Sequence, residues 1–122
     1  MTRRRMALGM SGEKAAAAFL ESAGFTIREC RYTTRFAEVD LIATRNDRLV
    51  FVEVKARSNT RKGMPRESVT PAKQKKIIQA AQWFLKTHPD YGRHHIRFDV
   101  VELVRQNSQW EITHIPNAFG AG

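Results

Sequence analysis

The segment FAEVDLIATRNDRLVFVEVKAR, residues 36–57, constrains the fold of this chain more than any other. Two apolar runs, 37–44 and 49–57, flank the pair Asn46-Asp47. Asn and Asp tolerate the left-handed backbone of a tight type I′ turn, so the segment predicts a β-hairpin. Its second run, LVFVEV, is apolar on both faces, which is typical of an interior strand. The hairpin is therefore expected inside a sheet rather than at its edge.

Four charged residues interrupt this apolar hairpin: Glu38, Asp40, Glu53 and Lys55. With a two-residue turn, Asp40 lies opposite Glu53 and Glu38 lies opposite Lys55, with Cβ atoms roughly 4.5–5.5 Å apart. The alternation of side chains along a strand also places all four on one face. A loop of three or five residues would shift this register, and a bulge could restore it.

Two carboxylates that close repel each other, and protonation, an intervening lysine or a divalent cation would relieve the repulsion. Mg²⁺ takes one or two protein carboxylates and binds substrate phosphates, and Mn²⁺ accepts the same oxygen ligands. A lysine two residues beyond a carboxylate ligand can reach the attacking water or the scissile phosphate. Asp40, Glu53 and Lys55 therefore suit metal-assisted phosphodiester hydrolysis. The alternative is a solvated hairpin end with an ion pair between Glu38 and Lys55, which the apolar surroundings disfavour.

The flanking sequence predicts two helices and three more strands. Ser11 can cap a helix over 12–23, with Glu13 in its first turn and Gly24 at its end. Thr70-Pro71 begins a second helix that runs to about residue 87. The remaining strands are expected over 25–32, 96–104 and 110–115.

These elements predict one α/β domain over residues 1–122, a mixed central sheet of about five strands flanked by helices. Residues 1–10 are expected to form a flexible basic arm and residues 116–122 a flexible tail. Asp99 is assigned a structural role, either pairing with Arg97 or supporting the sheet. Trp83, Phe84 and Trp110 are interpreted as core or partly exposed packing residues.

The charge of the chain favours a polyanionic partner. Lys and Arg number 21 against 12 acidic residues, so the formal net charge is +9, and nucleic acid is the first candidate. Eight basic residues fall between positions 55 and 76, and those predicted to contact phosphates are Arg57, Arg61, Lys62, Arg66 and Lys73. A solvated loop is the alternative for this run.

Cysteine content and hydropathy indicate the cellular compartment. Cys30 is the single cysteine, and no CxxC motif is present, which suits a reducing cytoplasm. No apolar stretch approaches the length of a membrane span. A soluble, cytoplasmic protein without a membrane partner is expected.

Five segments carry a resemblance that covers about residues 12–101: GEKAAAAFLESAGF, AEVDLIA, LVFVEVKAR, VTPAKQKKI and RFDVV. In this order and spacing they resemble the bacterial YraN-type family, a branch of the PD-(D/E)-x-K nuclease superfamily that is similar to the archaeal Holliday-junction resolvases. The resemblance implies a restriction-endonuclease-like core.

The same resemblance implies roles for individual residues. Asp40 and Glu53 match the metal ligands, Lys55 matches the catalytic lysine, and Glu13 matches an acid that completes the metal site in resolvase-like members. The alternative for Glu13 is a first-turn acid favoured by the helix dipole. Glu38 belongs to a GEID-like motif and is expected to support the site. Ala37 stands where the family usually has Gly, and it would cost stability if that position needed a positive φ.

The function expected from residues and resemblance together is a divalent-metal-dependent endonuclease that hydrolyses phosphodiester bonds in DNA, with branched or flapped DNA among its substrates and Mg²⁺ or Mn²⁺ as cofactor. The alternative is a non-catalytic nucleic-acid-binding module with a nuclease-like fold, which would have no need for the intact set of Asp40, Glu53 and Lys55. A homodimer is compatible with either function.

Overall fold

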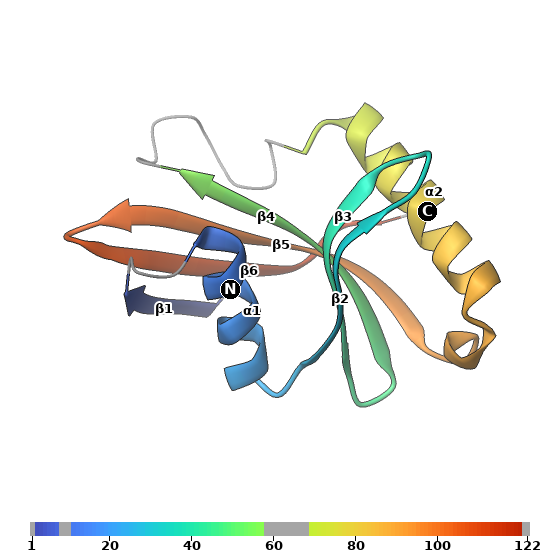
Figure 1. Ribbon diagram of the computed structural model, residues 1–122, viewed down its shortest axis with the longest axis horizontal. Coiled ribbons are helices and arrows are strands. Elements are labelled where there is room, and N and C mark those ends of the chain that lie inside the picture. The colour runs from blue at the N-terminus through green and yellow to red at the C-terminus, as the bar shows by residue number, and fades with distance from the viewer. Residues whose placement is uncertain (1, 8–10, 58–68, 121–122) are drawn as a thin grey trace.

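The computed structural model describes residues 2–7, 11–57 and 69–120. They form a mixed sheet with the strand order β1-β6-β5-β4-β3-β2, in which β4 and β5 are parallel and the other neighbours are antiparallel (Figure 1). The elements in chain order are β1 (Thr2–Ala7), α1 (Gly12–Ser22), β2 (Thr26–Thr33), β3 (Glu38–Arg45), β4 (Arg48–Arg57), α2 (Pro71–Thr87), the 3₁₀ turn η2 (Pro89–Tyr91), β5 (His95–Gln106) and β6 (Gln109–Phe119). The α/β fold with a mixed sheet flanked by helices is confirmed.

Local capping chemistry sets the ends of both helices. The Ser11 hydroxyl accepts the Lys14 N–H at 3.3 Å at the start of α1, and Gly24 adopts a φ of 93° just past its end. The Thr70 hydroxyl accepts the Lys73 N–H at 3.2 Å at the start of α2, where Pro71 takes the first position. The predicted caps are confirmed.

The central hairpin also forms as predicted around its two-residue turn. Arg45 pairs with Arg48, and Asn46 has a φ of 55°. The predicted register continues to the pair Leu41–Val52.

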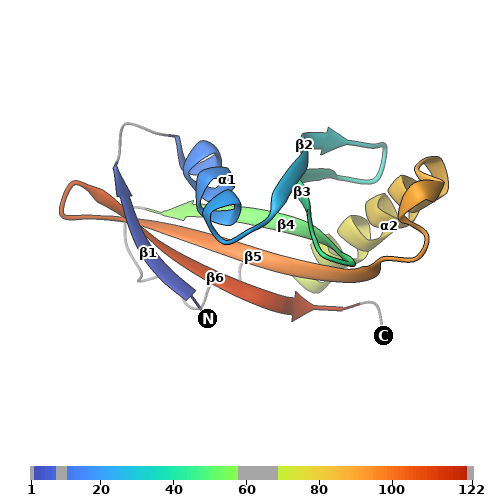
Figure 2. The ribbon, with the colours of Figure 1, turned by 90° about the horizontal axis from the view of Figure 1, so that it is seen from below.

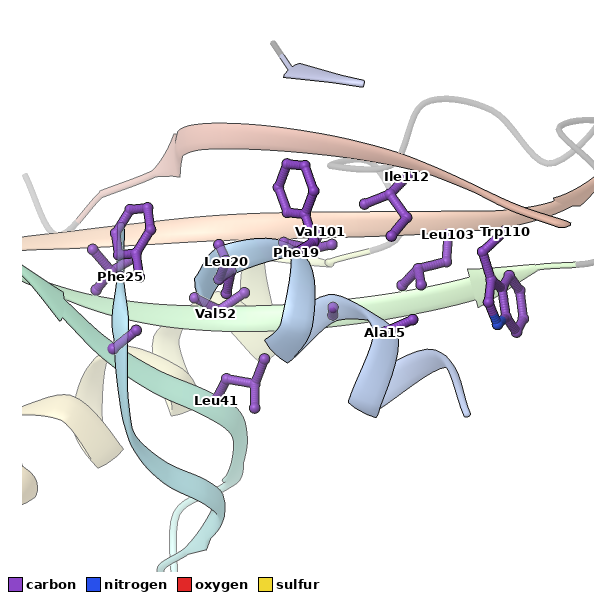
Figure 3. Close-up of a cluster of buried hydrophobic side chains, with 13 residues drawn as sticks. Ala15, Phe19, Leu20, Phe25, Leu41, Val52, Val101, Leu103, Trp110 and Ile112 are labelled. Carbon is purple, nitrogen blue, oxygen red and sulfur yellow. The ribbon is translucent and has the colours of Figure 1, made fainter. Parts of the chain in front are cut away.

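Two apolar clusters cover the two faces of the sheet. One contains Phe19 and Leu20 of α1 (Figure 3), and the other contains Ile77 and Phe84 of α2. Figure 2 shows α1 on one side of the long strands. Residues of β4 alternate between the clusters, since Val50 and Val52 join the α1 cluster while Leu49 and Phe51 join the α2 cluster. By the same alternation, residues 53 and 55 belong to the α2 face.

Strands occupy described parts of both terminal segments, where the sequence predicted none. Where a flexible arm was expected, β1 pairs antiparallel with β6, from Thr2–His114 to Ala7–Gln109. Strand β6 continues through Phe119, into the expected tail. Backbone groups along a sheet edge can pair with a further strand whatever its side chains, so hydrophobic patterning gives little sign of such a strand.

A buried carboxylate ties the end of β6 to β5. Asp99 is fully buried and accepts hydrogen bonds from Arg97 Nε and Nη2, both at 2.8 Å, from His114 Nε2 at 2.7 Å and from the Asn117 N–H at 2.9 Å. Burial alone would raise the pKa of Asp99, but the bonds from His114, Arg97 and Asn117 outweigh it and lower this pKa. The predicted pairing with Arg97 is confirmed.

Replacing Asp99 should destabilise the fold strongly. Asp99→Asn leaves Arg97 without its buried counter-charge and weakens the hydrogen bond to His114, and we expect a loss of about 3–5 kcal/mol in the free energy of unfolding. Urea denaturation measures this loss. Asp90→Asn, at an exposed position in η2, is the matched control and should change stability by less than about 0.5 kcal/mol. Similar stabilities for the two variants would contradict the role given to Asp99.

Candidate active site

Strands β3 and β4 separate immediately beyond the pair Leu41–Val52. At the next position, Asp40 Oδ2 accepts the Val54 N–H at 2.7 Å, so a side chain occupies the place of a backbone acceptor. Val39 packs in the α2 cluster although Leu41 packs in the α1 cluster, whereas a regular strand would put both on one face. The alternation of side chains along β3 is therefore interrupted at Asp40, so that residues on either side of it point to opposite faces of the sheet.

This change of facing overturns part of the predicted register. Backbone pairs between Asp40 and Glu53 and between Glu38 and Lys55 are absent from the described ladder. Glu38 pairs instead with Thr33 of β2, whose hydroxyl lies 3.5 Å from its Oε2. The neighbouring strand β2 is irregular at the same level. Arg31, which lies across from Asp40, has a φ of 53°, so both strands depart from regular β geometry at this point.

Asp40 and Glu53 nevertheless meet in one cleft. The cleft has a volume of about 540 Å³ and lies between the diverging strands and the first turns of α2; its lining residues are Phe36, Ala37, Glu38, Asp40, Glu53, Thr70, Ala72, Lys73 and Lys76. Both carboxyl groups line this cleft, close enough for the charge of Asp40 to raise the pKa of Glu53. The sequence thus predicted the pair of carboxylates correctly, although not the backbone geometry that brings them together.

Glu53 is the most unusual group in the cleft. Only 1% of its surface is exposed, and neither carboxyl oxygen has a hydrogen-bond partner among the described residues. The closest cation is Lys73, whose Nζ lies 3.3 Å from Glu53 Oε1. Burial, reinforced by the Asp40 carboxylate, raises the pKa of Glu53 to about 7. Such a buried, under-coordinated carboxylate is uncommon in a purely structural role.

Two lysines approach the carboxylates from different elements. Lys73, from the first turn of α2, lines the cleft, whereas Lys55, from β4, lies near it but is not among the lining residues. Burial and the nearby Lys73 charge lower the pKa of Lys55. The position of Lys73 follows from the β4-α2-β5 crossover, which returns the start of α2 over the Glu53 face of the sheet.

The donor set fits a small, hard divalent cation. Asp40 and Glu53 would hold it, because the oxygens of Glu53 lack hydrogen bonds and a second carboxylate lies beside them. Two protein carboxylates are a normal complement for Mg²⁺, which keeps several waters.

Glu13 does not join this pair in the structure. Its Oε2 accepts a hydrogen bond from Arg31 Nε at 3.0 Å, and both residues line a separate pocket with Cys30 and Leu41. Among the described residues no group of three His, Cys, Asp or Glu side chains is arranged to hold a metal. The pKa of Arg31 is raised mainly by Glu13, with smaller contributions from the charges of Glu38 and Asp40. No feature of the sequence marked Arg31 as the partner of Glu13.

The structure answers the expectation about Ala37. This residue is not among those with a positive φ, so its backbone suits alanine as well as glycine. The Ala37 carbonyl instead accepts the backbone N–H of Thr34 at 3.0 Å.

The predicted phosphate contacts divide into three groups. Lys73 lies in the cleft. Arg57 is largely buried, with its Nε 3.3 Å from Glu102 Oε2, so it serves an ion pair between β4 and β5. Arg61, Lys62 and Arg66 lie outside the described residues.

The raised pKa of Glu53 predicts a specific pH dependence of stability in metal-free protein. Between the ordinary value of 4.5 and about 7, the unfolded chain ionises this carboxyl while the folded chain keeps it protonated. Wild type should therefore lose stability relative to Glu53→Gln as pH rises through this window, by on the order of 3 kcal/mol, and the difference should level off above it. Urea denaturation of both proteins in EDTA measures the difference. A difference that stays constant with pH would contradict the shift.

Comparison with known proteins gives consistent matches along the chain. The model of "Uncharacterised protein family UPF0102" matches residues 12–103. A "UPF0102 protein" of Myxococcus xanthus is 42% identical over 118 residues, covering 97% of this chain and 93% of that protein. A relative in Desulforapulum autotrophicum is 47% identical over 119 residues, covering 98% of each chain. In the described part of the chain, neither helix has the length and apolarity needed to cross a membrane.

Proposed function

The chain belongs to the UPF0102 family, and from the chemistry of its cleft we propose that it is a divalent-metal-dependent endonuclease that hydrolyses phosphodiester bonds in DNA. The observation that carries the proposal is Glu53, a buried carboxylate that has no hydrogen-bond partner among the described residues and lies near Asp40 and two lysines. A fold gains nothing from such a group, whereas a cation-dependent site requires it. The family resemblance set out above points to the same activity.

Each residue of the cleft has a distinct task in this reaction. Asp40 and Glu53 hold Mg²⁺ or Mn²⁺, which supplies Lewis acidity to a phosphoryl oxygen when bound. Asp40 is fixed for this task by its bond from the Val54 N–H. Lys55 directs the attacking water or stabilises the charge that develops on the phosphate. Lys73 and Lys76 bind the non-reacting phosphate oxygens at the N-terminal turns of α2.

The pairing of Lys73 with Glu53 suits a site that assembles with its substrate. In the free protein the Lys73 ammonium lies 3.3 Å from the carboxylate and offsets part of its charge. An incoming phosphate offers Lys73 another anion, and Glu53 is then available to the cation. Metal and DNA should therefore bind cooperatively, with weak metal binding in the absence of DNA.

A second candidate function is a nucleic-acid-binding module that does not cleave. The specific observation in its favour is that Arg31 holds Glu13, so that Glu13 does not complete a metal site with Asp40 and Glu53 among the described residues. This module would explain the net charge of +9 and the lysines of the cleft. It would not explain the buried, under-coordinated Glu53, and for this reason we favour the nuclease.

Substitution of Lys55 separates catalysis from binding. Lys55→Ala should lower the rate of DNA cleavage in Mg²⁺ or Mn²⁺ by at least about 100-fold, because the lysine acts on the transition state. Its affinity for DNA should fall by less than about tenfold, since other basic residues remain. Lys55→Arg should also cleave poorly, because a planar guanidinium does not replace a compact ammonium in a tight site.

The assay uses single-stranded, duplex and four-way-junction DNA, with cleavage followed on gels and affinity by fluorescence anisotropy. Lys14→Ala, an exposed lysine on α1, is the matched control and should cleave at the wild-type rate. Equal cleavage by Lys55→Ala and wild type would show that the catalytic centre lies elsewhere. Tight DNA binding by a wild-type protein that cleaves none of these substrates would favour the binding module.

A further inference from the structure

A second hollow opens beside the candidate active site. It has a volume of about 360 Å³ and is lined by Thr34, Arg35, Phe36 and Trp83, and we call it the Trp83 pocket. Phe36 lines both this pocket and the cleft that holds Asp40 and Glu53, so the two are adjacent. Its size lies at the small end of the range of about 300–1,000 Å³ that is typical of small-ligand pockets.

Trp83 is exposed although the chain buries most of its large apolar side chains. In the described residues only Trp83, at 42%, and Ile96, at 37%, remain exposed among these. The other tryptophan, Trp110, is 7% exposed and packs in the α1 cluster. An exposed indole that lines a pocket adjacent to the candidate active site offers an apolar surface on which a ligand can stack.

The opposite wall of the pocket is held in a fixed conformation. The Thr34 hydroxyl accepts the N–H groups of Phe36 at 3.0 Å and Ala37 at 3.2 Å and lies 3.0 Å from the Ala37 carbonyl. The Arg35 guanidinium lies over the Phe36 ring, 5.0 Å from its centroid. Figures 1 and 2 both place the tip of the β2–β3 hairpin beside α2. The pocket is therefore preformed, which reduces the entropic cost of binding.

The charges around the pocket select the kind of ligand. Lys73, Lys76 and Trp83 lie on one face of α2, and the first and last are about 15 Å apart along the helix axis. Lys86 Nζ lies 5.8 Å from the centroid of the Trp83 ring, and Arg35 stands on the opposite wall. The described residues that line the pocket include no acidic side chain. An aromatic surface within a row of cations suits a planar ring attached to a phosphate backbone.

We propose that the Trp83 pocket binds an unpaired nucleobase of the DNA strand whose phosphate enters the Asp40–Glu53 cleft, a proposal that rests on the function proposed above. Bases within a duplex are stacked on each other and offer only their edges, whereas an unpaired base can stack on an indole. The substrate is accordingly DNA with a single-stranded segment within a few nucleotides of the scissile bond. Blunt duplex DNA engages the lysines but leaves the Trp83 pocket empty.

The test measures tryptophan fluorescence in EDTA, where no cleavage occurs. Single-stranded oligothymidylate should quench the exposed Trp83 saturably, because stacking on a base quenches indole emission. A blunt duplex of equal length should bind with little quenching. In Trp83→Ala the emission of the buried Trp110 should not respond to the oligonucleotide.

Binding affinity supplies the second readout. Trp83→Ala and, on the opposite wall, Arg35→Ala should weaken binding of oligothymidylate by at least about fivefold in fluorescence anisotropy and change duplex binding much less. Gln82→Ala, at the exposed neighbouring position of α2, is the control and should bind as wild type. Absence of quenching, equal quenching by duplex, or unchanged oligonucleotide affinity in Trp83→Ala would overturn the base site. Cleavage without quenching would overturn the base site alone, whereas quenching without cleavage in any metal would support it and refute the nuclease.

Discussion

The hydrogen bond from the Val54 N–H to Asp40 Oδ2, at 2.7 Å, is the interaction on which the rest of the site depends. It forms where β3 leaves β4, and it satisfies a backbone donor that the ladder abandons. Without it the separation of the strands would leave a buried N–H group unpaired. Because of it, Asp40 faces Glu53, the cleft opens toward α2, and the hairpin tip that carries Phe36 reaches the side of that helix.

Local chemistry in the sequence was sufficient to predict both helices, five of the six described strands and the proximity of Asp40 to Glu53. The Asn46-Asp47 turn, the Ser11 and Thr70 caps and the apolar alternation of β4 each depend on neighbouring residues alone, and all are observed. Residues 53 and 55 share a face for the same reason. The features that the sequence did not predict depend on distant segments. Arg57 pairs with Glu102 because of the parallel register of β4 and β5, and Glu13 meets Arg31 because α1 covers the face opposite α2. Strand β1 forms by pairing with an edge, which requires no apolar pattern.

The unfavourable burial of the Glu53 carboxylate is offset by a residue within the cleft itself. Glu53 is buried and finds no hydrogen-bond partner in the described part of the chain, and Lys73 offsets its charge from 3.3 Å. The Asp99 network is a useful contrast within the same sheet, since every oxygen of that buried carboxylate is satisfied by Arg97, His114 or the Asn117 N–H. The environment of Asp99 thus suits a role in stability, whereas that of Glu53 suits the binding of a cation or ligand. The Trp83 pocket lies next to the cleft and shares Phe36 with it, which suits the proposal that the arriving molecule extends beyond a single phosphate.

The central claim is that Asp40 and Glu53 form a cation site, and titration calorimetry with MnCl₂ in the absence of DNA tests it most directly. Wild type should bind one Mn²⁺ ion weakly, and Asp40→Asn should lose at least about tenfold in affinity. Asp47→Asn, at an exposed position in the β3–β4 turn, changes the net charge equally and should bind as wild type. Equal Mn²⁺ affinity in wild type and Asp40→Asn would contradict the account.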